Sequence, residues 1–192
     1  DRAVTYILEA NRDDTGAFRL RKGPRGRSLS LTGALLWALG RLGYRDDPRL
    51  AKSWAWVYAQ SEECPPPSAL VWLLRAADFW REVDFAKRWI DALVFDGLSS
   101  LTFPLTHRAD GLAVLEAWCD VASTLHASAL PREVAQAHRR LIGMHRDGAD
   151  GGWSLGRVPG KLWFDPGPIG QCNSWVTIRV LRVLRMLDRL SG

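Results

Sequence analysis

The amino-acid sequence predicts an all-α protein of about eight helices. Apolar residues recur at helical spacing along most of the chain, and strand-like alternation is weak. In addition, a unit of helix, turn and helix is repeated within the chain, which predicts stacked helical hairpins. The length of 192 residues suits one domain over residues 1–192. Because the first residue is Asp1 and not Met, this domain could also be a fragment of a longer chain.

The segment over residues 173–190 has the clearest helical pattern. Its apolar residues share one side and predict a core face: Val176, Val180, Val183, Leu184 and Leu187. The other side is expected to face water, since it carries Arg182, Arg185 and Arg189. Residues 32–42 give a second amphipathic helix, for which Gly43 is the expected stop.

Six further helices are expected, in chain order, at residues 2–11, 48–60, 67–80, 84–94, 109–126 and 131–145. Three of them start at Pro48, Pro67 and Pro131, because proline fits the first turn of a helix but not its middle. Two long segments rich in Gly, Arg and Pro remain as loops, at residues 13–29 and 147–171. Loops of this length in a compact helical domain often carry function.

The chain has a formal net charge of +5, and nearly all of its basic residues are arginine. Arginine binds phosphate well, so nucleic acid and diphosphates have to be considered as partners. Acidic residues are interleaved, as in Arg45-Asp46-Asp47, and no basic block stands alone. A solvated basic surface is therefore predicted, and nucleic acid is not an expected partner.

The cysteines and the hydropathy exclude several classes of protein. Cys64, Cys119 and Cys172 are widely separated and form no CxxC motif, so neither a zinc ribbon nor a disulfide framework is predicted. No apolar run approaches the length of a bilayer span, and no secretory leader opens the sequence. We expect a cytoplasmic protein with no transmembrane segment, no cofactor and no metal.

The internal repeat is the most informative feature. Residues 6–18 align without a gap on residues 141–153. In both copies an apolar helix leads into a short acidic turn, which ends in Gly16-Ala17-Phe18 or in Gly151-Gly152-Trp153. The helices that follow the two loops also match, with Thr32 at the position of Thr177. A third and looser copy runs through residues 92–110, and residues 67–72 look like the start of another hairpin.

This unit resembles the repeat of the terpenoid cyclase and protein prenyltransferase superfamily. The family's QW motif has a Gln followed by Gly-x-Trp, and here Asn11 and Arg146 stand in place of the Gln. The segment Asp150-Gly151-Gly152-Trp153 is the sharpest match. The resemblance implies an α/α toroid-like array of stacked hairpins around an apolar cavity. Eight helices would form only part of the usual ring.

The family's chemistry is not evident in the sequence. Class II terpenoid cyclases use an Asp-x-Asp-Asp acid, but this chain has only Asp13-Asp14 and Asp46-Asp47, which we interpret as turns or caps. Protein prenyltransferases hold zinc with Asp, Cys and His. The resemblance leaves open that His107, Asp110 and Cys172 meet at one rim of the ring, although caps and loop contacts are the favoured interpretation. Cys119 and His126 are expected to pack within one helix rather than to form a catalytic pair.

The ten tryptophans suggest a ligand site. In the family, aromatic side chains stabilise cationic isoprenoid intermediates. The candidate ligand-binding residues are Trp37, His107, Asp110, Trp118, Trp153, Trp163, Asp165 and Trp175. The alternative, that the tryptophans only fill a repeat core, stays open. The apolar loop at residues 160–168 is the first place to expect a ligand, while the basic loop at residues 19–27 could hold a diphosphate or simply be solvated.

Three functions remain in competition. The first is a squalene cyclase-like or prenyltransferase-like repeat domain with an aromatic-lined pocket for an isoprenoid or lipid-like ligand, with catalysis left open. The second is a non-catalytic helical-repeat interaction module. The third is an active terpenoid cyclase or prenyltransferase with atypical acid or metal ligands. Because an incomplete ring exposes two hairpin edges, a homodimer or a flanking domain is an expected partner.

Overall fold

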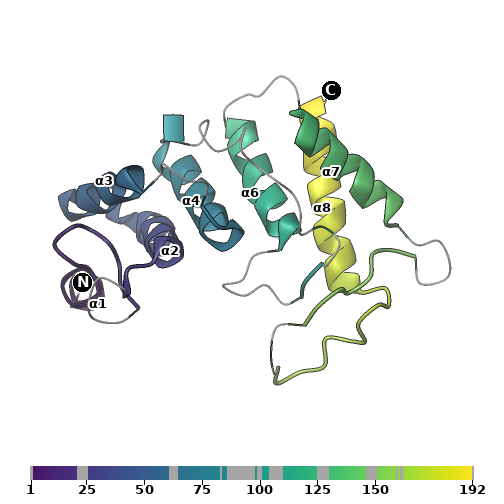
Figure 1. Ribbon diagram of the computed structural model, residues 1–192, viewed down its shortest axis with the longest axis horizontal. Helices are drawn as coiled ribbons and strands as arrows, with labels where there is room; N and C mark the ends of the chain where they lie inside the picture. Colours follow the sequence, from purple (N-terminus) through teal and green to yellow (C-terminus); the bar gives the residue numbers. More distant parts are fainter. Residues whose placement is uncertain are drawn as a thin grey trace. The chain divides into compact units, whose positions relative to one another are not determined.

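The computed structural model is all-helical over the residues that it describes, which confirms the predicted fold class (Figure 1). These residues are 2–20, 26–60, 65–82, 84–85, 98, 101–103, 110–124, 130–145, 151–158, 160 and 162–191. Within them, extended pairing is limited to four isolated bridges, and no helix has both the length and the apolar character needed to cross a membrane. The chain divides into two compact units, residues 1–90 (unit 1) and 91–192 (unit 2). The single domain and the toroid remain predictions.

Unit 1 contains the helices α1 (Arg2–Ala10), α2 (Leu29–Leu39), α3 (Ala51–Ala59) and α4 (Pro67–Trp80). A π-helical segment, Gly40–Tyr44, extends α2, and a 3₁₀ turn, Pro48–Leu50, leads into α3. All four predicted helices are present, and α4 has the predicted bounds. The helix α2 starts three residues earlier than predicted because Ser28 caps it by accepting a hydrogen bond from the backbone N–H of Leu31.

The contact between α2 and α4 is unusually close. A β-carbon at Gly33 of α2 would lie only 3.1 Å from the backbone nitrogen of Leu73 on α4. The indole N–H of Trp80 donates to the carbonyl oxygen of Leu36 at 3.1 Å. The hydroxyl oxygens of Ser30 and Ser68 are 3.4 Å apart. Small residues on α2 therefore allow the two helices to pack tightly.

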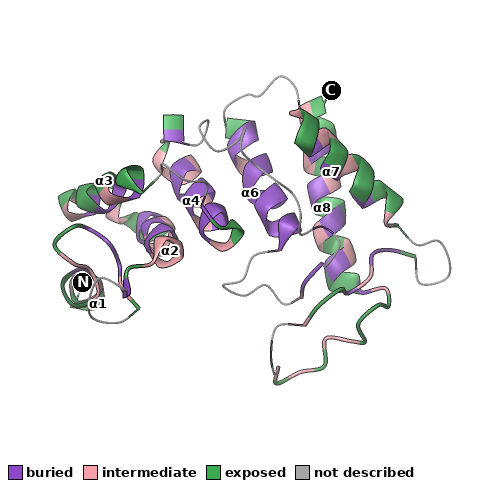
Figure 2. Cartoon of the chain, in the orientation of Figure 1, coloured by how far each residue is buried: buried purple, intermediate pink, exposed green. Residues whose placement is uncertain are grey.

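Unit 2 contains α6 (Gly111–Thr124), α7 (Arg132–Gly143) and α8 (Ser174–Ser191), each within two residues of its predicted start. The helix α6 is buried on nearly every side, as Figure 2 shows. The predicted core face of α8 is buried at Val176, Val180, Val183 and Leu187, whereas Leu184 is only half-buried. Of the helix predicted at residues 84–94, only residues 84–85 are described, and both are helical.

The two copies of the repeat share the same hydrogen bonds. In the first, the backbone N–H of Phe18 donates to the Thr32 hydroxyl at 3.0 Å, and its carbonyl oxygen accepts from Ser28 at 3.0 Å. In the second, Trp153 donates to the Thr177 hydroxyl at 3.1 Å and accepts from Asn173 at 3.0 Å. The aromatic residue is thus tied twice to the start of the helix that follows its loop.

The bases of the two loops also correspond. The backbone N–H of Leu20 donates to Gly26, and that of Leu155 donates to Gln171, both at 2.9 Å. One bridge lies just outside each pair, Arg19 with Arg27 and Ser154 with Cys172. Between the paired residues the second loop is ten residues longer (155–171 against 20–26). The third, looser copy lies largely outside the described residues.

The Thr32 hydroxyl is expected to stabilise the first copy measurably. Thr32→Val keeps the shape of the side chain but leaves the buried N–H of Phe18 without its acceptor, which should cost about 1–3 kcal/mol in the free energy of unfolding. Urea unfolding followed by circular dichroism measures this cost. Thr32→Ser keeps the hydroxyl and is the matched control. An unchanged free energy of unfolding for Thr32→Val would show that this hydrogen bond does not stabilise the first copy.

Candidate functional site

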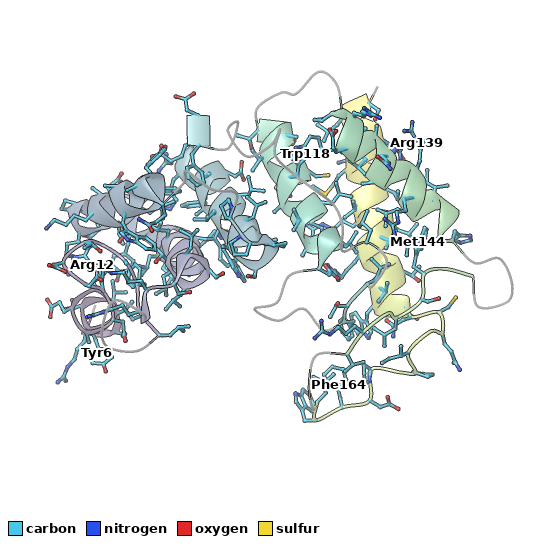
Figure 3. The ribbon with its side chains drawn as sticks, in the orientation of Figure 1. Tyr6, Arg12, Trp118, Arg139, Met144 and Phe164 are labelled. Carbon is cyan, nitrogen blue, oxygen red and sulfur yellow. The ribbon has the colours of Figure 1, made fainter. Side chains whose placement is uncertain are left out.

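Four aromatic side chains of unit 2 gather around the start of α8, and we call them the aromatic platform: Phe103, Trp163, Phe164 and Trp175. Trp163 and Phe164 belong to the long loop of the second repeat, where Figure 3 labels Phe164. Trp175 lies in the first turn of α8. Phe103 comes from a segment far away in the sequence, before α6.

The rings form a continuous chain of contacts. Phe103 stacks on Trp175 with 5.4 Å between ring centroids and 1° between the ring planes. Phe164 meets Phe103 edge to face at 6.2 Å, and Trp163 meets Phe164 in the same manner at 5.3 Å. Offset stacking and edge-to-face contact are the favourable geometries for aromatic pairs. The platform is therefore an ordered arrangement of rings.

Two sets of hydrogen bonds position the platform. Phe103 is placed by an extended pairing with the long loop, in which Gly156 donates to Leu101 at 2.8 Å and Thr102 bridges Arg157. Asn173 holds the far end of the loop, because its side-chain N–H donates to the Pro166 carbonyl at 2.7 Å. Its side-chain oxygen also accepts from the backbone of Val176 at 3.1 Å and so caps α8.

The platform is open to solvent. Trp163 is 94% exposed and Trp175 is 59% exposed, whereas tryptophan is usually largely buried in folded proteins. Ile169, on the same loop, is also exposed. Exposed apolar side chains of this size are typical of a binding site for an apolar ligand or for a partner.

A buried ionic cluster lies between α6 and α8. The Arg179 guanidinium forms a bidentate pair with the Asp110 carboxylate, with both N–O distances 3.2 Å, and approaches Glu116 at 3.4 Å. Asp110 also accepts from the backbone of Thr102 and from that of Ala113, each at 2.8 Å. These four donors use about all the acceptor sites of a carboxylate. Asp110 therefore fixes the start of α6 and the segment around Thr102, which leads directly to Phe103 of the platform.

The structure separates the predicted ligand-binding tryptophans by environment. Trp118 has no exposed surface and lies within the core of unit 2, where it is labelled in Figure 3. Trp153 is also buried, and its indole N–H donates to the Leu141 carbonyl at 2.6 Å. Trp37 belongs to unit 1, where its ring lies 5.6 Å from that of Trp72. Only Trp163 and Trp175 belong to the platform.

The other predicted site residues have structural contacts or lie outside the described residues. Asp165 is exposed and accepts from the backbone of Gly167 at 2.9 Å, which forms the turn of the long loop. Asp110 belongs to the ionic cluster. His107 lies outside the described residues, so the trio with Asp110 and Cys172 is untested. Within the part of the chain that the structure describes, no three His, Cys, Asp or Glu side chains are grouped as metal ligands.

The remaining polar candidates have local roles. Asp47 caps the 3₁₀ turn, and the Arg49 hydrogen bond lowers the pKa of its carboxyl. Partial burial raises the pKa of Asp13, but hydrogen bonds from Thr15 and Arg27 outweigh it and lower the pKa overall. Both carboxylates thus serve a turn or a cap, as predicted. In the basic loop, Arg27 pairs with Asp13 at 2.6 Å, and residues 21–25 are outside the described residues.

Cys119 does not have the properties of a nucleophile. Burial, with smaller contributions from Asp120 and Glu116, raises the pKa of its thiol to about 12. The thiolate, which is the reactive form, is therefore negligible at neutral pH. His126 and Cys64 lie outside the described residues, and Cys172 is half-buried in the bridge at the base of the long loop.

Comparison with known proteins identifies no relative: the chain matches no family model, no curated protein and no solved structure. The geometry of the two units therefore carries the functional argument. Among the residues of the site, the sequence did not indicate Phe103, Arg179 or Glu116. Each of them contacts a partner that is distant in the sequence, and no local pattern marks such a contact.

Proposed function

We propose that the chain is a helical-hairpin repeat domain that binds an apolar, isoprenoid-like or lipid-like molecule on the aromatic platform. The nearly complete exposure of Trp163, at the end of an ordered row of rings, is the observation that carries this proposal. Covering an exposed aromatic side chain with an apolar ligand gains roughly 1.5–3 kcal/mol per side chain. The repeat's resemblance to terpenoid cyclases and prenyltransferases supports an isoprenoid as the ligand.

Binding without chemical conversion agrees best with the contacts. The buried carboxylate of Asp110 has all its acceptor sites occupied, and Glu116 lies beside the same arginine. Neither has the arrangement of an acid directed at a substrate on the platform. The Cys119 thiol stays protonated at neutral pH. The proposal therefore assigns no reaction to the chain.

Titration with farnesol tests the proposal. We expect calorimetry to detect binding to the native chain and about ten-fold weaker binding to Phe164→Ala, because this ring links Trp163 to Phe103. Leu20→Ala removes an apolar side chain that is also exposed but belongs to unit 1, so it should bind as the native chain does. The unbranched alcohol decanol separates an isoprenoid site from a general apolar one.

Each possible result of the titrations has a different meaning for the proposal. Loss of farnesol binding in Phe164→Ala with retention in Leu20→Ala supports the platform as the site. Equal affinity for farnesol and decanol would support a lipid-like ligand over an isoprenoid. Farnesol binding that is unchanged in Phe164→Ala and in Trp163→Ala would remove the platform from the proposal.

A second candidate function, an interaction module, is favoured by one separate observation. Beyond the platform, α8 exposes Ile178 and Leu181 on the side away from its core residues. A partner is the usual reason for such a surface in a helical repeat.

A further inference from the structure

The exposed apolar face of α8 consists of Trp175, Ile178 and Leu181, which are 52–59% exposed. The spacing of three residues places them on one side of the helix. The core side of the same helix is separate and buried, since it carries Val176, Val180 and Val183. The helix α8 thus has two apolar sides, of which one is covered by the described residues of unit 2.

The internal repeat matches the exposed side of α8 with a side of α2. Ser28 and Asn173 cap α2 and α8, and Thr32 and Thr177 bind the two aromatic backbones, so the two helices align residue by residue. This alignment pairs the exposed face of α8, in order, with Ser30, Gly33 and Leu36.

In α2 these positions form the contact with α4. Gly33 lies against Leu73, the Ser30 hydroxyl faces that of Ser68, and the Leu36 carbonyl accepts from Trp80. The exposed face of α8 is therefore the repeat equivalent of a helix–helix interface that already exists in unit 1.

The side of α8 that carries Arg179 is covered, whereas the corresponding side of α2 is partly exposed. Arg179 faces α6, where it pairs with Asp110 and Glu116. Its equivalent in α2 is Ala34. Around Ala34 the side of α2 is apolar and only half-buried, and it comprises Leu31, Ala34, Leu35 and Ala38. We call this set the α2 edge.

We infer that two copies of this chain associate head to tail, with the exposed face of α8 in one copy packed on the α2 edge of the other. The contact continues the helix stacking seen within each unit. Both surfaces are apolar, and the small side chains of Ala34 and Ala38 on the α2 edge leave room for the large side chains of α8. Arg182 and Arg185 lie farther along α8 and are expected to form a solvated rim. Two different surfaces meet in such a contact, so it is heterologous.

Complementation between two variants tests this geometry. Ile178→Lys disables the α8 face, and Ala34→Lys disables the α2 edge. Each change should raise the dissociation constant at least about ten-fold by burying an unpaired charge, so each variant alone should sediment as a monomer where the native chain associates. A mixture of the two should form a dimer, because one intact α8 face and one intact α2 edge remain.

Matched controls use the same substitutions elsewhere. Ile142→Lys changes an exposed isoleucine of α7, and Ala59→Lys changes an exposed alanine of α3, so both should associate like the native chain. A native chain that stays monomeric throughout a dilution series overturns the inference. So does an Ala34→Lys variant that still associates, which would indicate a symmetric contact between two α8 faces, or a mixture that stays monomeric.

This inference deepens the interaction-module function and does not depend on ligand binding. The Ala34→Lys variant leaves every residue of unit 2 unchanged, including the four rings of the platform, so farnesol titration of this monomeric variant reports on the platform alone. Association without farnesol binding contradicts the ligand-binding proposal alone. Farnesol binding without association contradicts the head-to-tail contact alone.

Discussion

Replacing Arg179 by Met is expected to lower the free energy of unfolding of unit 2 by about 3–5 kcal/mol. The arginine side chain is 13% exposed, and the carboxylates of Asp110 and Glu116 beside it are 3% and 8% exposed. Without the guanidinium, two negative charges stay buried with no cation between them. Breaking a buried ion pair from one side carries this cost because the remaining charge is desolvated and unpaired. Urea unfolding measures the total, and hydrogen exchange of the α6 amides assigns it to unit 2.

Arg182→Met is the control for the loss of an arginine from α8. Arg182 is exposed on the same helix, so its replacement should change stability by less than about 0.5 kcal/mol. Adding Asp110→Asn to Arg179→Met should restore part of the loss, because asparagine still caps α6 but carries no charge. A loss as small for Arg179→Met as for Arg182→Met would show that the cluster is not a source of stability.

The second large effect is expected at Gly16. Gly16→Ala should destabilise unit 1 by about 2–5 kcal/mol, since two penalties add. The backbone of Gly16 has a φ of +100°, which side-chain-bearing residues rarely adopt. A β-carbon there would also lie 2.2 Å from the carbonyl oxygen of Lys52 and 2.8 Å from the backbone nitrogen of Ser53. Thermal and urea unfolding of the variant measure the sum.

Substitutions at two other glycines distinguish the conformational cost at Gly16 from the steric cost. Gly43 has a φ of +90° with open space around it, so Gly43→Ala should cost only the conformational part, about 1–2 kcal/mol. Gly143 closes α7 without a positive φ and has no neighbour within 4 Å, so Gly143→Ala should stabilise the helix by about 0.5–1 kcal/mol. If Gly16→Ala lowers the free energy of unfolding no more than Gly43→Ala does, then the turn at Gly16 relieves the contact with Lys52 at no cost in stability.

The helices were predictable because their signals are local. Pro67 starts α4 where the sequence indicated, and the apolar spacing of α8 placed its core face correctly at Val176, Val180 and Val183. The repeat was also visible in the sequence, since it depends on short motifs within each copy. Its hydrogen bonds between an aromatic backbone and a threonine hydroxyl were not predicted, although Thr32 and Thr177 were aligned.

The candidate site was only partly predictable. Trp163 and Trp175 stood out because they are tryptophans in and beside a long loop. Phe103 lies 72 positions before Trp175 and is brought to it by backbone pairing with the loop, which no spacing rule can anticipate. Arg179 was likewise one more arginine in a helix rich in them, and its partner Asp110 is 69 positions away. Burial and charge pairing between distant segments decide these roles.

The two repeat loops are closed at the base by equivalent backbone hydrogen bonds, and this arrangement allows the loops to vary in evolution. Because the same bonds close a short loop at Leu20 and a longer one at Leu155, residues can be added at the tip while both flanking helices keep their places. Lengthening a loop is also cheap, as each doubling adds only about 0.6 kcal/mol of closure entropy. Insertion and deletion at this point can therefore exchange one recognition surface for another, and the repeat serves as a frame on which new specificities arise.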